Sequence, residues 1–266
     1  MTKIDLKNLM QDYRRDGYVS AVDIIDGEAA ARHRTALEEA ETTFGPLHYK
    51  TKVHTILRSP FELASHPQVL DIVEAMIGPD ILLYNVTYII KEPGATSFVS
   101  WHQDLTYWGL SHDDQVSMWL ALSSTTEESG CMRMVPGSHV GGRREHIIEG
   151  HVDNVLFQGQ KVDGVSEGDA VNCPLAPGQA SFHHGWTLHA SLPNSSTDRR
   201  IGLNVQYLAA HVRQTKYETD SAMLVRGVDK HHHFDADIAA EIDLAPHAIA
   251  RQIELENRYR SIAGRN

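Results

Sequence analysis

The sequence predicts a mainly β protein with flanking helices, built on a double-stranded β-helix, also called a jelly roll or cupin-like barrel. The chain has 266 residues, of which 41% are hydrophobic and 22% charged, as in an ordinary globular protein. About eight short runs rich in β-branched and aromatic residues fill its middle, and turn-forming residues separate them. We expect one domain over residues 1–266, with a helical part at 1–79, a β-helix core at 80–210, and a C-terminal lid and helix at 211–266.

The expected helices lie toward both ends of the chain. Residues 5–15 form a short polar pattern, and residues 27–44 are rich in Ala and Glu before a Gly-Pro stop. Residues 60–77 carry a third helical pattern that closes at another Gly-Pro pair, and residues 236–262 carry a fourth. These segments would pack around the β core.

The expected strands begin at residues 80–91, where DILLYNVTYIIK is β-branched and aromatic and stops at a Pro-Gly turn. Side chains alternate along a strand, so one face from Leu82 to Ile90 is apolar and aromatic, while the other carries Asn85 and Thr87. Pointing into the barrel, Asn85 and Thr87 would touch a co-substrate or substrate; hydrogen bonding within the sheet explains them equally well. The other predicted strands are residues 97–103, 115–123, 130–135, 169–173, 180–184, 187–191 and 200–208.

Charge and cysteine content exclude several classes of protein. The formal net charge is −11, from 24 Lys and Arg against 35 Asp and Glu, which disfavours a nucleic-acid partner. No apolar run is long enough to span a membrane, and the first residues lack the apolar segment of a secretory signal. Two cysteines, Cys131 and Cys173, cannot build a disulfide framework. We therefore expect a cytoplasmic protein whose partner is a small-molecule substrate.

Histidine, the commonest metal ligand in proteins, occurs 17 times. On a strand, His102 and Asp104 would point to the same side. Two histidines and one carboxylate on one face of an octahedron form the Fe(II) site of non-haem oxygenases. The chain has four His-x-Asp triplets, at 102–104, 112–114, 151–153 and 233–235, and the first stands out because apolar and aromatic residues flank it. Solvated turns explain the other three more simply.

A third ligand must come from another strand, and the histidines at 183, 184 and 189 are the candidates. Only His189 is followed eleven residues later by an arginine, Arg200, which opens the last predicted strand. An arginine one strand away would hold a second anion through a planar, bidentate contact. This spacing favours His189.

Three motifs together resemble the phytanoyl-CoA dioxygenase family of Fe(II)- and 2-oxoglutarate-dependent oxygenases. They are WHQD at 101–104, GCMRMVPGSH at 130–139, and HASLPNSS followed by Arg at 189–200. Their order and spacing agree with the family from about residue 14 to residue 227. The combination is specific, whereas each motif alone is not.

The resemblance implies roles for individual residues. Arg200 would grip the distal carboxylate of 2-oxoglutarate, Ser191 would assist it, and Trp119 would line the co-substrate pocket. Related halogenases lack the carboxylate ligand that this chain keeps, so the resemblance favours hydroxylation with O2 and release of succinate and CO2. The residues that would bind Fe(II) and carry the catalysis are His102, Asp104 and His189.

The substrate is less well defined by the sequence. Gln103 and Arg133 would meet it, and Tyr107 and Trp108 would form an aromatic wall over it or pack in the core. We expect a small polar molecule, such as an organophosphonate or an amino-acid derivative, to be hydroxylated at an aliphatic C–H bond. The alternatives are a zinc-dependent hydrolase or isomerase with an open coordination position, and a non-catalytic cupin-like metal-binding module.

Overall fold

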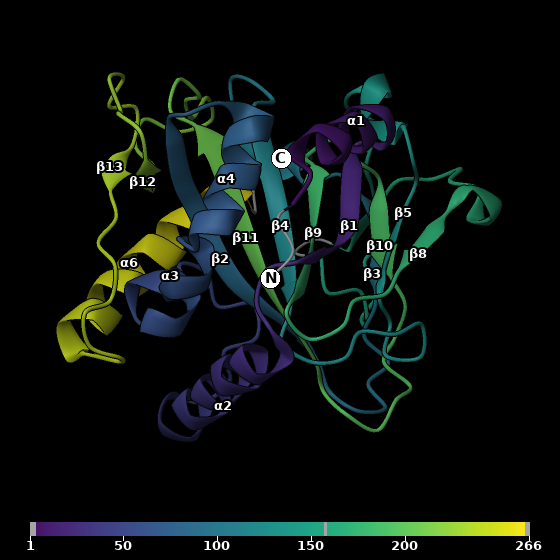
Figure 1. Cartoon of the computed structure of the whole chain (residues 1–266), viewed down its shortest axis with the longest axis horizontal. Helices are drawn as coiled ribbons and strands as arrows, with labels where there is room; N and C mark the ends of the chain where they lie inside the picture. The colour runs from purple at the N-terminus through teal and green to yellow at the C-terminus, as the bar shows by residue number, and fades with distance from the viewer. Residues whose placement is uncertain (1–3, 157–158, 264–266) are drawn as a thin grey trace.

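Two mainly antiparallel sheets face each other in the computed structural model, which describes residues 4–156 and 159–263 (Figure 1). Within that part of the chain, β6 (Ile147–Ile148) and β7 (Gln160–Lys161) form a separate two-stranded ribbon beside β3 (Val99–His102). The smaller sheet has the order β3, β10 (His189–Ser191), β5 (Met132–Met134), β8 (Val171–Cys173). The larger has the order β1 (Tyr18–Asp23), β9 (Gln179–His184), β4 (Gln115–Ala121), β11 (Arg200–Ala209), β2 (Ile81–Lys91), β12 (Ser221–Arg226), β13 (Asp235–Ala236).

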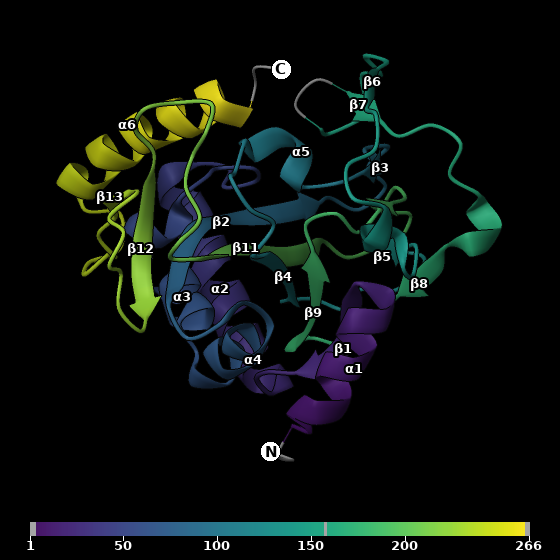
Figure 2. The same ribbon diagram turned by 90° about the horizontal axis from the view of Figure 1, so that it is seen from above.

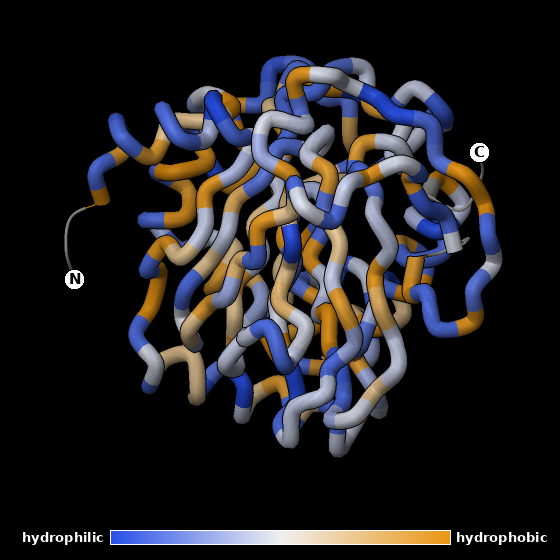
Figure 3. The backbone as a smooth tube through the Cα atoms, turned by 90° about the vertical axis from the view of Figure 1, so that its right-hand side faces the viewer, coloured by the Kyte–Doolittle hydropathy of each residue, from blue (hydrophilic) through white to orange (hydrophobic). Residues whose placement is uncertain are grey.

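The predicted jelly roll is therefore confirmed, and each of the expected core strands is present. Hydrophobic and hydrophilic residues alternate along much of the sheet region (Figure 3), as expected for strands that bury one face more deeply than the other. Strands β1, β12 and β13 lie outside the predicted β core. They extend the larger sheet with residues from the segments expected to be helix and lid.

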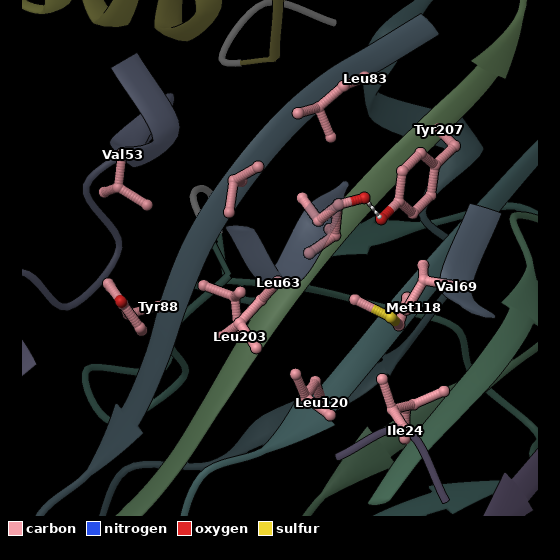
Figure 4. Close-up of a cluster of buried hydrophobic side chains, with 14 of the residues drawn as sticks. Ile24, Val53, Leu63, Val69, Leu83, Tyr88, Met118, Leu120, Leu203 and Tyr207 are labelled. Atoms are coloured by element: carbon pink, nitrogen blue, oxygen red, sulfur yellow. Dashed lines mark hydrogen bonds between the residues drawn. The ribbon is translucent and has the colours of Figure 1, made fainter. Parts of the chain in front are cut away.

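Helices cover the outer face of the larger sheet. Leu63 and Val69 from the helices pack with Leu203 and other sheet residues in the main hydrophobic core (Figure 4). Tyr207 donates a hydrogen bond from its hydroxyl to the carbonyl of Ala64 (2.7 Å) and so ties the sheet to this layer. The helices of this layer are α1 (Leu6–Asp16), α2 (Gly27–Phe44), α3 (Arg58–Ala64) and α4 (Pro67–Ile77), with the short η1 (Val53–Thr55) beside them.

Two helix predictions are wrong in extent. The pattern at 60–77 forms two helices rather than one, because Pro67 opens α4 and disfavours a helical conformation in the residue before it. The pattern at 236–262 becomes helical only at Pro246, where α6 (Pro246–Ala263) begins. Among the described residues no helix is both long and apolar enough to cross a membrane.

A bulge in β2 changes the predicted faces of that strand. Gln206 of β11 opposes Asn85, but the next residue, Tyr207, opposes Leu83, so Tyr84 is an extra residue in the ladder. Val86 and the alternate residues after it pack in the main core as predicted, whereas Tyr84 turns to the other side. Its ring lies 6.1 Å from that of Trp108 and 5.9 Å from that of Tyr259 on α6.

The C-terminal helix is fastened to the β core beside α5 (Leu105–Trp108), as Figure 2 shows. Gln252 donates to the carbonyl of Thr51 (2.7 Å). The segment before the helix, which contains Asp237, is held by a buried ion pair, in which Nζ of Lys52 lies 2.8 Å from Oδ2 of Asp237. Buried ion pairs need such precise placement to offset the cost of desolvation, so this segment and α6 have a defined position on the core.

Candidate active site

The two sheets enclose a cavity of about 370 Å³. The larger sheet contributes Asn85 and Thr87 from β2 and Trp119 from β4, and the smaller sheet contributes residues of β3 and β10. Its position explains why polar side chains at these strand positions are buried. The predicted site residues that line it are His102, Asp104, His189, Arg200, Ser191, Trp119, Asn85, Thr87 and Tyr107.

The structure brings the three candidate metal ligands together. One ligand atom from each of His102, Asp104 and His189 lies within 4.8 Å of the other two, and all three residues are buried. Both imidazole Nε2 atoms approach the same oxygen, Oδ1 of Asp104, at 3.5 Å for His102 and 3.7 Å for His189. The triad converges on one point although its members come from β3, the turn after it and β10.

Backbone contacts orient the two imidazoles. Nδ1 of His102 donates to the carbonyl of Ser100 (2.9 Å), and Nδ1 of His189 donates to that of Thr187 (3.0 Å). Each ring therefore presents the lone pair of Nε2 to the centre, which is the form that binds a metal. Burial, followed by the neighbouring imidazoles, lowers the pKa of His189 well below its usual range, which favours the neutral form.

The carboxylate is held by its other oxygen. Oδ2 of Asp104 accepts from Oγ of Ser117 (2.8 Å) and lies 3.3 Å from Nε2 of His183. Burial raises the pKa of Asp104, but the surrounding histidines, led by His189, hold it well below its usual range. Oδ1 thus stays anionic and aimed at the centre. Two imidazoles and one carboxylate on one side fit a non-haem Fe(II) ion.

Arg200 is a buried cation without an acidic partner among the described residues. It is 1% exposed. Its Nη1 donates to the carbonyl of Gly130 (2.9 Å), and its Nε has no hydrogen-bond partner. The guanidinium lies over the ring of Trp119, 4.9 Å from the centroid, and burial lowers its pKa to about 10. A buried charge requires a counter-charge, and a carboxylate entering the cavity would supply one to the guanidinium of Arg200.

Lys91 is a site residue that sequence reasoning missed, although it shares the face of Asn85 and Thr87. It pairs with Arg200 across the β2–β11 ladder. Its Nζ contacts the hydroxyl of Ser191 (2.8 Å), the carbonyl of Ser191 (3.3 Å) and the carbonyl of Leu192. Because Oγ of Ser191 accepts from Lys91, the hydroxyl proton of Ser191 is left to donate into the cavity.

We expect Lys91→Met to raise the KM for 2-oxoglutarate about tenfold, the effect of one misdirected hydrogen bond. Burial and then Arg200 lower the pKa of Lys91 to about 6. The ammonium dominates below that pH and favours an anion, so co-substrate affinity should fall as pH rises through about 6. Lys91→Met should lose this pH dependence and keep its metal affinity. Titrations across that pH range measure both effects, and an unchanged profile in the variant would contradict the role.

Asn85 and Thr87 line the cavity and also bond to each other. Nδ2 of Asn85 donates to Oγ1 of Thr87 (3.1 Å), while Oδ1 of Asn85 accepts from the backbone of Lys52 (2.8 Å). Hydrogen bonding within the protein is therefore present, and contact of Asn85 and Thr87 with a co-substrate or substrate stays a prediction.

Gln103 and Arg133 do not reach the cavity, contrary to the prediction that they meet the substrate. The amide of Gln103 is used by the backbone: it donates to Gly142 and Trp186 (2.8 Å each) and accepts from Arg144 (2.7 Å). Arg133 stacks on the ring of Trp101 (5.4 Å) and pairs with Glu167. Gln103 lies in the turn after β3, between the two ligands, and its side chain is used by the backbone of Gly142 and Trp186.

Other residues of the cavity come from places that the motifs do not mark. Alternation from Arg200 along β11 would have found Asn204 and Gln206. Nothing local in the sequence marks Tyr49, from the loop before η1, because tertiary packing brings it in. The same holds for the pairs Val155 and Leu156 near the β6–β7 ribbon, and Tyr259 and Arg260 on α6.

Comparisons with known proteins agree with this site. A probable alpha-ketoglutarate-dependent hypophosphite dioxygenase of Stutzerimonas stutzeri is 31% identical over 152 residues, covering 56% of this chain and 52% of that protein. A 1-deoxypentalenic acid 11-beta-hydroxylase of Streptomyces exfoliatus is 25% identical over 221 residues, covering 73% and 77%. This chain covers about half the length of the first of these relatives.

A solved structure described as the non-heme monooxygenase ThoJ in its apo form superposes with a TM-score of 0.81 at 28% identity, covering 95% of this chain and 99% of that one. The family model for phytanoyl-CoA dioxygenase (PhyH) matches residues 13–202. That range includes all four strands of the smaller sheet, the three candidate ligands and Arg200. The chain belongs to the phytanoyl-CoA dioxygenase family.

Proposed function

We propose that the protein is an Fe(II)- and 2-oxoglutarate-dependent dioxygenase that hydroxylates an aliphatic C–H bond of a small molecule. One observation carries this proposal: a two-histidine, one-carboxylate triad shares a cavity with Arg200, a buried cation that has no acidic partner among the described residues. A structural metal site or a hydrolytic zinc site has no need for such an anion clamp. The family membership and the names of the relatives support the same reaction class.

Each group has a definite part in this proposal. His102, Asp104 and His189 would hold Fe(II) and leave the remaining coordination positions to ligands in the cavity. When bound, iron, 2-oxoglutarate and O2 would supply the oxidation of an unactivated C–H bond, with succinate and CO2 as co-products. The chain supplies placement and exclusion of water.

The co-substrate end of the cavity is defined by Arg200. Its guanidinium would bind the distal carboxylate of 2-oxoglutarate, and Ser191 would donate its hydroxyl proton to the same group. Trp119 packs under the guanidinium and fixes its plane. Gly202 makes room for this stack, because a Cβ there would lie 1.8 Å from the indole.

The substrate proposed from the sequence is a small polar molecule such as an organophosphonate or an amino-acid derivative. The cavity supports an anionic group on the substrate, as developed below. It also offers aromatic walls from Tyr107 and Trp108, both of which line it. These rings would pack against a hydrocarbon portion of the substrate.

The deciding experiment is anaerobic. Fe(II) is added to the metal-free protein, followed by 2-oxoglutarate, and the visible spectrum is recorded for the weak charge-transfer band of an iron-chelated keto acid. We expect the band to appear, and succinate to form once air is admitted. Absence of the band together with tight retention of Zn(II) would reject the proposal in favour of the hydrolase or metal-storage alternatives.

A further inference from the structure

We propose that Arg260 recognises an acidic group of the substrate, so that the natural substrate is an organic anion with an apolar body. This inference rests on the proposed function and names its substrate class. It starts from the C-terminal helix, which lies outside the family match at residues 13–202 and still forms one wall of the cavity through Tyr259 and Arg260.

The strand register places this wall relative to the reaction centre. Arg200 pairs with Lys91 at one end of the β2–β11 ladder, and Gln206 pairs with Asn85 farther along it. Gln206 also pairs with Ser117, the residue that holds Asp104. The next residue of β2 beyond Asn85 is Tyr84, against which Tyr259 packs.

Tyr259 therefore packs against the part of β2 that is farther from the Lys91–Arg200 pair. Tyr84 and Lys91 are seven residues apart on β2, which corresponds to roughly 20 Å along a strand. The two arginines thus belong to different parts of one cavity. Arg200 serves the co-substrate, and Arg260 is available to a second anion.

Hydrogen bonds to its neighbours orient the guanidinium of Arg260 but do not use all of its donors. Its Nε and Nη2 donate to a single oxygen, Oε1 of Glu256 (3.1 and 2.8 Å). Its Nη1 has no hydrogen-bond partner among the residues that the structure describes, and its side chain is 53% exposed. An anion at the mouth of the cavity can therefore reach it from solvent.

Glu256 is already occupied on both oxygens. Its Oε2 accepts from Nζ of Lys50 and from Nε2 of Gln252 (3.0 Å each). One carboxylate between two cations leaves a net charge of +1 on this cluster of Lys50, Glu256 and Arg260. The mouth of the cavity is thus locally positive, although the whole chain carries −11, and an anion is favoured there.

Much of the lining of the cavity is apolar or aromatic. Tyr107, Trp108, Val155 and Leu156 line it together with Tyr259. Such a surface binds hydrocarbon. An acid with a hydrocarbon body would place its charge at Arg260 and its C–H bonds among these side chains, near the triad.

The test uses the anaerobic Fe(II)- and 2-oxoglutarate-loaded protein and probes of matched shape. Octanoate, cyclohexanepropionate and octylphosphonate are compared with neutral octanamide, and binding is followed by the change each causes in the charge-transfer band. We expect the acids to bind about tenfold or more tightly than the amide, as for a charge-assisted hydrogen bond. Arg260→Gln should lower the affinity for the acids to that for the amide, and Arg260→Lys should retain part of the preference for acids.

The matched control is Arg258→Gln, which removes the same charge from the same helix. Arg258 pairs with Asp235 (2.8 Å) and does not line the cavity, so the preference for acids should persist. The inference would be overturned if octanoate and octanamide bind equally, or if the preference for acids survives Arg260→Gln. It would also be overturned if the charge-transfer band forms normally but addition of the acids does not change it. Loss of the band itself in Arg260→Gln would also overturn it, whereas absence of any band in the wild type rejects the proposed function instead.

Discussion

Asp104→Ala is expected to lower Fe(II) affinity at least a hundredfold and to abolish turnover. Among the residues that the structure describes, Asp104 supplies the only carboxylate oxygen that converges on the centre. Loss even of residues that merely orient a ligand costs about 10–100-fold in metal affinity, and loss of the ligand itself should exceed that. Equilibrium Fe(II) binding under anaerobic conditions measures the effect directly.

A graded variant and a control sharpen this prediction. Ser117→Ala leaves the ligand in place but removes the hydrogen bond to its other oxygen, so an intermediate loss of metal affinity is expected. Asp153→Ala changes the aspartate of another His-x-Asp triplet, which instead accepts from Oγ1 of Thr96 (2.8 Å), and should bind Fe(II) like the wild type. Undiminished Fe(II) binding by Asp104→Ala would show that the triad has been assigned incorrectly.

Arg200→Met should raise the KM for 2-oxoglutarate a hundredfold or more while Fe(II) affinity stays within a few-fold of the wild type. The shorter Met side chain keeps an unbranched apolar stem but would lose the proposed bidentate, desolvated contact, and each charge-assisted hydrogen bond is worth about 1.5–3 kcal/mol. A keto acid would still chelate iron, so very high 2-oxoglutarate concentrations should restore part of the turnover. The measurement is a co-substrate titration of both the charge-transfer band and succinate formation.

The neighbouring arginine provides the control for charge. Arg199 is partly exposed and pairs with Glu92 and Glu41 (2.9 Å each), so Arg199→Met should leave the co-substrate KM unchanged. Burial disfavours an unpaired guanidinium, so the co-substrate-free Arg200→Met variant should melt no lower than the wild type. A KM for 2-oxoglutarate equal in Arg200→Met and wild type would refute the anion clamp.

The core of the site was predictable because its signals are local or regularly spaced. His102 and Asp104 are two residues apart in an apolar stretch, and His189 and Arg200 bracket a turn between two recognisable strands. The substrate residues were less predictable for a physical reason. Gln103 and Arg133 are polar residues close to motifs, but their side chains satisfy backbone groups and an outer carboxylate rather than a ligand.

Tertiary structure also altered the strand faces. The bulge at Tyr84 reverses the alternation in β2, and only pairing with β11 reveals it. Lys91 illustrates the reverse case, since its face was predicted but its importance was not. A lysine at the end of a strand is usually solvated, and its burial beside Arg200 and Ser191 depends on how the two sheets close.

By itself, the sequence determined the jelly roll, the helical layer, the three candidate ligands and the arginine of the co-substrate end. The fold follows from periodicity and turn residues, the pairs His102 with Asp104 and His189 with Arg200 follow from short spacings, and the family resemblance implies their roles. Only the tertiary structure decided which side chains complete the cavity: Lys91 behind Ser191, Tyr49 from a loop, and Arg260 from a helix near the end of the chain. Their positions depend on contacts between segments far apart in sequence, and no local pattern encodes such contacts.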